Sequence, residues 1–266
     1  MPAQPRTPQQ PTAAERFPRS AVWLMGTGFV GLAGLFLFSQ LISTVEHSSR
    51  PVGEDVRAVE VRVDVGKVTV NVTEEDTARA SLRSTFTSGL RPPAEAVEQV
   101  RDTLRVNANC GRLTGDCSTD YELTVPAETR VTVRTAHGHV SAKGLRASVA
   151  ARVEVGDVRM IDVRGRTITA RSQTGNVTLS DVRFRTADTA TERGQIRVVS
   201  TSGFTRLRAL NHTGDVVLTL PRRSGPYAVE ARGGTGRRTV DVERDAAAPA
   251  TVQASTSEGD VTITGD

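Results

Sequence analysis

The chain is poor in aromatic residues, which make up only 4% of its 266 residues. Phe, Tyr and Trp supply much of the buried volume of a thick globular core. Their scarcity therefore favours a thin core built by stacking similar layers.

A surplus of one charge is also missing. The net charge is +4, and almost all basic residues are arginines. The sequence has no basic run interleaved with aromatic residues, which argues against nucleic-acid binding.

Short catalytic motifs are absent as well. We find no His-Glu-x-x-His, no Gly-x-Ser-x-Gly and no phosphate-binding Gly-x-x-x-x-Gly-Lys. We therefore expect a protein that is not an enzyme and that uses no cofactor and no metal.

What is present is a repeated phrase: an apolar–polar alternation, a glycine, a polar residue and a second alternation. Ser172 to Leu179 is one copy. The repeat glycines are Gly66, Gly138, Gly156, Gly175, Gly194, Gly214 and Gly259. From Gly138 to Gly214 they lie 18, 19, 19 and 20 residues apart, and a fixed period of this length indicates a stacked repeat.

Alignment of the copies on the glycine predicts two strands per repeat. The residues two and four places after the glycine, and seven and five places before it, are almost all apolar or small. The inward phase changes at the glycine, so a tight turn must lie there. A two-strand unit buries its apolar row only by stacking on copies of itself, which predicts an all-β, single-stranded β-solenoid with a β-helix-like repeat. An antiparallel sandwich with glycine hairpins is the alternative.

One further copy, near Gly236, is weak because Arg238 occupies an apolar position. We expect a loosened rung or an outward loop there.

The region before the repeats predicts a membrane protein. Residues 1–20 are proline-rich and predict a disordered cytoplasmic tail, and residues 21–42 carry no charge and are long enough for one N-terminal transmembrane α-helix. Arg16, Arg19 and Trp23 are the expected membrane-interface anchors, and the positive-inside rule places the following domain outside. A cleaved signal peptide is the alternative.

The rest of the chain divides into a linker and a repeat domain. We expect a linker over 43–55 and an extracytoplasmic β-repeat domain over 56–266. Within this domain, residues 78–86 and 104–108 predict strands, and residues 94–101 predict one short helix.

Cys110 and Cys117 are the only cysteines. In an extracytoplasmic domain we expect them to form a disulfide. A redox pair or a metal site is the alternative, but no histidine is adjacent.

Asp157, Asp215 and Asp260 directly follow repeat glycines, as does Asn176. Acids in a row could bind a cation or act as a hydrolase pair, but Asp and Asn are also common turn residues. Asp157 and Asp215 would lie three rungs apart, about 14 Å at strand spacing, too far for paired glycosidase carboxylates. We expect turn residues.

The histidines give no metal site either. His137 and His139 lie about four rungs from His212, so we expect surface histidines.

Several phrases resemble the DUF4097 family. They are Tyr121-Glu-Leu-Thr-Val-Pro126, the stretch from Val131 to Val140, and the serial Gly-Asp-Val or Gly-Asn-Val phrases. The resemblance covers roughly residues 56–266, and the cysteine pair before Tyr121 is similar to that of membrane-anchored actinobacterial members. It implies a β-helix-like fold that is often anchored or exported. Members are called putative adhesins, some act in envelope stress responses, and no catalytic residue is carried over.

Together these observations predict a single-pass cell-membrane protein that presents its repeats as an adhesin-like binding or structural surface. An envelope protein or a cell-wall polymer is the expected partner. The alternatives are an accessory sensor that acts through a membrane partner, and a polysaccharide-cleaving β-helix enzyme.

Overall fold

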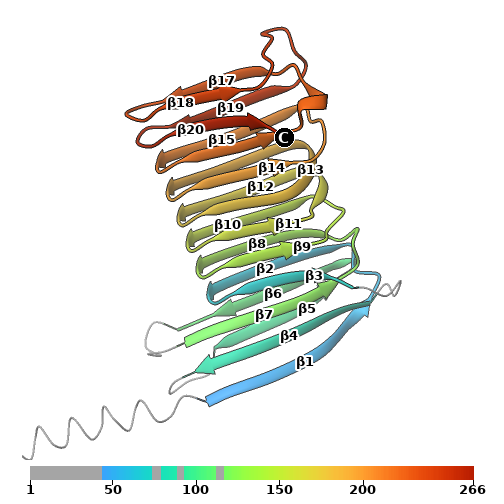
Figure 1. The fold of residues 1–266 in the computed structure, drawn as a ribbon. Coiled ribbons are helices and arrows are strands. Elements are labelled where there is room, and N and C mark those ends of the chain that lie inside the picture. The colour runs from blue at the N-terminus through green and yellow to red at the C-terminus, as the bar shows by residue number, and fades with distance from the viewer. Residues whose placement is uncertain (1–43, 74–78, 89–92, 112–116) are drawn as a thin grey trace, which may run out of the picture. The chain divides into compact units, whose positions relative to one another are not determined.

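The computed structural model describes residues 44–73, 79–88, 93–111 and 117–266. This part of the chain is almost entirely β-structure, with a single 3-10 turn at Arg222–Ser224 (Figure 1). In chain order the described strands are β1 (Thr44–Glu54), β2 (Ala58–Val65), β3 (Val68–Val72), β4 (Arg79–Ser88), β5 (Ala94–Val100), β6 (Thr103–Asn109), β7 (Cys117–Val125), β8 (Arg130–His137), β9 (Val140–Lys143), β10 (Val149–Val155), β11 (Val158–Ile161), β12 (Arg164–Thr174), β13 (Val177–Arg193), β14 (Ile196–Ser200), β15 (Arg206–Thr213), β16 (Val216–Leu220), β17 (Ala228–Gly233), β18 (Arg238–Asp241), β19 (Thr251–Thr256) and β20 (Val261–Gly265).

Each repeat forms one rung of two strands that meet at the glycine. Strands before the glycine pair with one another and form what we call the leading sheet, and strands after it form the trailing sheet. The leading sheet runs β5–β6–β2–β8–β10–β12–β13–β15–β19–β17. The trailing sheet runs β1–β4–β7–β3–β9–β11–β13–β14–β16–β20–β18. The long β13 contributes its first half to the trailing sheet and its second half to the leading sheet.

Neighbouring rungs pair in parallel and in strict register. Val149 lies opposite Val131 on one side and Ile168 on the other, so equivalent positions form continuous rows. The alternating side chains point inward and are buried; Val177 and Leu179, for example, are fully buried. Parallel pairing between rungs excludes the antiparallel sandwich and confirms the all-β repeat stack.

The spatial order of the rungs differs from their order in the chain at both ends. The β2–β3 rung lies between the β6–β7 rung and the β8–β9 rung. The β19–β20 rung lies between β15–β16 and β17–β18 (Figure 1). The copy around Gly236 is therefore the terminal rung rather than an outward loop. Because this rung has a neighbour on one side only, Arg238 can remain exposed.

The other end of the stack is closed by antiparallel strands: β1 pairs with β4, β4 with β7, and β5 with β6. The linker expected over 43–55 is wrong for 44–54, which form strand β1. The short helix expected over 94–101 is also wrong, because residues 94–100 form strand β5. Val97 packs on the core while Val100 is exposed. The edge of β6 pairs along the whole of β5, whereas a helix of this length would leave most of its terminal N–H and C=O groups without an intrahelical partner.

The buried aromatic residues of the described part of the chain lie toward the two ends of the stack. Phe184, Phe204 and Tyr227 stack in sequence, with ring centroids 5.2 and 5.5 Å apart, and the Tyr227 hydroxyl donates to the Pro221 carbonyl at 2.7 Å. At the opposite end, the buried Tyr121 donates its hydroxyl to Glu95 Oε1 at 2.9 Å. Burial raises the pKa of both phenols, and the Glu95 carboxylate adds to the effect at Tyr121. Aromatic packing therefore seals places where the repeat is irregular.

The expected membrane segment at 21–42, with Arg16, Arg19 and Trp23, lies outside the described residues. Among the residues that are described, no helix has the length and apolar character needed to cross a membrane.

Candidate functional site

The repeat glycines form one continuous column along the edge where the two sheets meet. All seven have positive φ, between 122° and 148°. The φ alone does not explain the choice of residue: a Cβ on Gly175 would overlap the carbonyl oxygen of Gly156 in the rung before it. The same overlap recurs along the column, so glycine is required because adjacent backbones approach closely here.

The residues directly after these glycines form a hydrogen-bonded ladder. Asp157 Oδ1 accepts from the backbone N–H of Asn176 at 2.8 Å, and Asn176 Oδ1 accepts from the N–H of Gln195 at 2.8 Å. Each side chain thus satisfies a backbone donor of the next rung, where our sequence interpretation expected a bond within its own turn. The Oδ1 atoms of these side chains therefore hold neighbouring rungs together.

A second ladder lies three residues before the glycines. The side chains of Ser172, Thr191 and Asn211 donate to the carbonyl oxygens of Gly156, Gly175 and Gly194, at 2.8 to 2.9 Å. Thr256 donates to Gly214 in the same way, at 2.9 Å. These buried polar side chains satisfy carbonyls that the turn would otherwise leave without a side-chain partner. Sequence reasoning missed this ladder, although its signal is the small polar residue at a fixed offset.

Asp215 and Asp260 lie in adjacent rungs, because the β19–β20 rung follows β15–β16 in space. Asp215 Oδ1 accepts from the Asp260 N–H at 2.9 Å, and Asp260 Oδ1 accepts from the Arg237 N–H at 2.8 Å. The Arg237 backbone donor, helped by its guanidinium, lowers the pKa of Asp260 below its usual value. This carboxylate is therefore an ionised partner of the terminal rung.

The predicted histidines do not converge. His137, His139 and His212 are all exposed, and His139 Nδ1 accepts from the Asp157 N–H at 3.1 Å as part of the first ladder. Within the described residues no group of three His, Cys, Asp or Glu side chains is placed to hold a metal ion.

The disulfide expected between Cys110 and Cys117 is present, with the two Cα atoms 5.9 Å apart. It joins β6 to β7 at the end of the glycine column. In this rung the backbone of Thr119 is the neighbour of Gly66. The rung therefore has a disulfide near the position where other rungs have a glycine turn.

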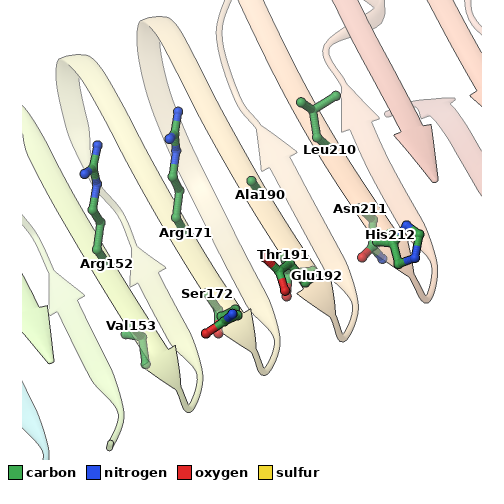
Figure 2. A pocket seen from close by; sticks show the side chains of 11 residues that line it. Arg152, Val153, Arg171, Ser172, Ala190, Thr191, Glu192, Leu210, Asn211 and His212 are labelled. Atoms are coloured by element: carbon green, nitrogen blue, oxygen red, sulfur yellow. The ribbon is translucent and has the colours of Figure 1, made fainter. Parts of the chain in front are cut away.

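A hollow lies on the outer surface of the leading sheet, beside the glycine edge (Figure 2). It consists of two shallow stretches, about 390 and 470 Å³ in volume, which share Arg152 and Val153. We call the two stretches together the outer groove. Its lining includes Arg62, Asp64, Arg134, Ala136, Glu154, Arg171, Gln173, Ala190, Glu192, Leu210 and His212.

Two outward rows of the leading sheet form the walls of the outer groove. One wall comes from residues four before the repeat glycines and the other from residues two before them. Figure 2 shows Arg152 and Arg171 extending side by side from neighbouring strands, and Leu210 further along the same row. Sequence reasoning missed this site, although its signal is the arginine four places before Gly66, Gly138, Gly156 and Gly175.

These features define a non-globular β-repeat protein: a parallel two-sheet solenoid with an open groove on one outer face. The DUF4097 family model, described as Toastrack DUF4097, matches residues 58–265, and the chain belongs to this family. None of the curated proteins matches the chain.

Comparison with solved structures gives one neighbour that supports the fold and others of lower similarity. A putative adhesin from Bacteroides fragilis is 14% identical with a TM-score of 0.54, covering 84% of this chain and 97% of its own. A putative cell adhesion protein from Clostridium sporogenes is 10% identical with a TM-score of 0.37 (84% and 100% covered), and a putative lipid binding protein from Parabacteroides distasonis is 9% identical with a TM-score of 0.45 (83% and 97% covered).

Proposed function

We propose that this chain is a non-enzymatic binding module that a membrane segment at 21–42 holds at the cell surface. In this proposal residues 1–20 remain in the cytoplasm and the solenoid lies outside, where it presents the outer groove to an envelope polymer or protein. The adhesin names of structural relatives are consistent with such a role.

One observation carries the proposal. The side chains at the glycine edge are used in hydrogen bonds between rungs, while the outer groove is open. Asp157, Asn176, Asp215 and Asp260 accept backbone hydrogen bonds from the next rung. Side chains fixed in this way serve the fold, whereas Arg62, Arg134 and Arg152 in the outer groove are exposed. A rigid scaffold with a long, shallow groove suits an extended ligand better than a small substrate.

The disulfide is also consistent with this location. A bond between Cys110 and Cys117 persists in an oxidising compartment and is rare in the cytosol.

The test is a crosslinking pull-down of the full-length protein from its native membrane, with mass spectrometry and sugar analysis of the captured material. We expect wall or envelope polymer, or another surface protein, to be recovered. Recovery of a sensor kinase, with signalling abolished when residues 1–20 are deleted, would instead support an accessory sensor. Recovery of cytosolic partners would contradict a surface role.

A further inference from the structure

Four arginines form one row along the outer groove: Arg62, Arg134, Arg152 and Arg171. We call them the arginine row. They lie four residues before Gly66, Gly138, Gly156 and Gly175, on strands β2, β8, β10 and β12. Direct register pairs join each to the next, because the out-of-order β2 lies against β8. At about 4.8 Å per rung, the row spans roughly 14 Å.

The positive charge of this row is poorly compensated. Arg171 pairs with Asp188, with Nη2 2.8 Å from Oδ2. Among the described residues, no carboxylate lies within ion-pair distance of Arg62, Arg134 or Arg152. Like charges directly opposite each other on neighbouring strands destabilise a sheet. The row therefore carries a repulsion that an anion bridging the guanidinium groups would relieve.

The surroundings of the row indicate what kind of anion fits. Asp64 and Glu154 stand on the other wall of the groove, which leaves the arginine side as the place for negative charge. Beyond Arg171 the same wall continues with Ala190 and Leu210, both partly buried, which make this stretch of it apolar.

Polar side chains stand on the facing wall of this stretch. Gln173, Glu192 and His212 line it and can hydrogen-bond to hydroxyl groups. The groove thus offers guanidinium groups at one end, and apolar side chains facing hydrogen-bonding groups at the other.

We propose that the outer groove binds a linear acidic polysaccharide with a carboxylate on successive sugar rings, its chain running across the strands. A sugar ring of an extended chain advances by nearly one rung spacing, so successive carboxylates can meet successive arginines. Guanidinium and carboxylate groups form paired, charge-assisted hydrogen bonds. Ala190 and Leu210 contact the C–H faces of further rings. A single-stranded nucleic acid would need aromatic stacking platforms, which this groove does not have.

This inference rests on the proposed role as a binding module and names its ligand. The test uses the full-length protein in detergent micelles, titrated with oligogalacturonate at low salt. The variant Arg134→Gln/Arg152→Gln should bind at least about tenfold more weakly, since each arginine supplies charged hydrogen bonds. The matched control Arg159→Gln/Arg197→Gln removes the same charge from the outer surface of the trailing sheet and should bind like the wild type.

A second readout separates binding from damage to the fold. Because the substitutions relieve repulsion, Arg134→Gln/Arg152→Gln should unfold at a higher temperature than the wild type at low salt without ligand. Oligogalacturonate should then raise the unfolding temperature of the wild type but not that of the variant.

Further probes define the ligand class. Neutral dextran should not bind, and polyglutamate and polyphosphate should bind more weakly than oligogalacturonate. The inference is overturned if either polymer binds as tightly as oligogalacturonate, if the variant binds like the wild type, or if oligogalacturonate does not bind. If the variant is still retained on native envelope material, only the arginine-row inference fails; if the wild type is not retained, the proposed function fails.

Discussion

Asp215 Oδ1 accepts a hydrogen bond of 2.9 Å from the backbone N–H of Asp260, which lies 45 residues further along the chain. The bond shows that the last rung of the chain is inserted beside β16, ahead of the rung around Gly236. An equivalent insertion places β2 against β8 at the other end. The C-terminal end of the stack is therefore closed by β17 and β18, which precede β19 and β20 in sequence.

Cysteine crosslinking tests this rung order. Val217 on β16 lies opposite Thr262 on β20, which in turn lies opposite Thr239 on β18. Val217→Cys with Thr262→Cys should form a disulfide on mild oxidation, because opposite residues of neighbouring strands have suitable Cα separations. Val217→Cys with Thr239→Cys should not. The opposite pattern, read by peptide mapping, would show that the rungs stack in chain order.

Gly175→Ala tests the close approach at the glycine column. The new Cβ would meet the Gly156 carbonyl at a φ of 145°. We expect a loss of about 3 kcal/mol or more in the free energy of unfolding, measured by urea denaturation. Gly233→Ala is the control, because its Cβ would be at least 3.5 Å from its neighbours. Equal effects of the two substitutions would refute the argument.

Asn176→Ala tests the first ladder. It removes the acceptor for the Gln195 N–H at 2.8 Å, and we expect a cost of about 1 kcal/mol. Asn176→Asp keeps an acceptor oxygen in place and should cost clearly less. Amide hydrogen exchange at Gln195 should quicken in the alanine variant only; unchanged exchange would show that the ladder bond contributes little.

Asp260 should give the terminal rung a pH dependence. Its pKa is lowered in the folded protein, first by the Arg237 backbone donor and then by the guanidinium. A lowered folded pKa means that its stabilising contribution is present above the unfolded pKa and is lost as the pH falls through the folded value. An NMR titration should show Asp260 ionising below the usual aspartate range.

Because the backbone donor is the largest cause, Arg237→Gln should raise the pKa of Asp260 only in part. A return to the ordinary value in this variant would show that the guanidinium dominates.

Replacing both cysteines by serine should loosen the end of the stack. The bridge closes a short loop between β6 and β7, and we expect a loss below about 3 kcal/mol. Hydrogen exchange should increase in β6 and β7 and stay unchanged in β12 and β14, since each rung contacts only its neighbours. Uniform loosening of all rungs would contradict this local role.

The sequence predicted the regular middle of the stack well. Apolar residues at fixed offsets from Gly138 to Gly214 define both inward faces, and the structure buries them: Val158 and Ile196 are fully enclosed. These predictions succeed because alternation and turn chemistry are local properties, and because repeated copies reinforce one register.

The ends could not be predicted in the same way. A strand pattern at Gly66 does not state which rung it pairs with, so the insertion of β2 and of β19 depends on long-range pairing. The linker prediction was wrong because β1 is an edge strand, so its sequence is polar. The helix prediction was wrong because Val97 and Val100 of β5 have a helical spacing by chance. Arg238, which occupies an apolar position of the repeat, was the available signal that the copy near Gly236 is unusual.

Part of the outer groove could have been predicted from the sequence. Arg62, Arg134, Arg152 and Arg171 share one offset from their glycines, but the row becomes four consecutive rungs only when β2 is placed beside β8. The proposed binding surface thus depends on the unusual rung order.

The most direct test of the account is to mix the full-length protein with isolated envelope polymers and measure both retention and polymer length. A binding module should co-sediment with the polymer, release it as salt rises and leave the polymer at full length. A polymer shortened by the purified protein, or one that never retains it, would contradict the central claim that this solenoid binds without catalysis.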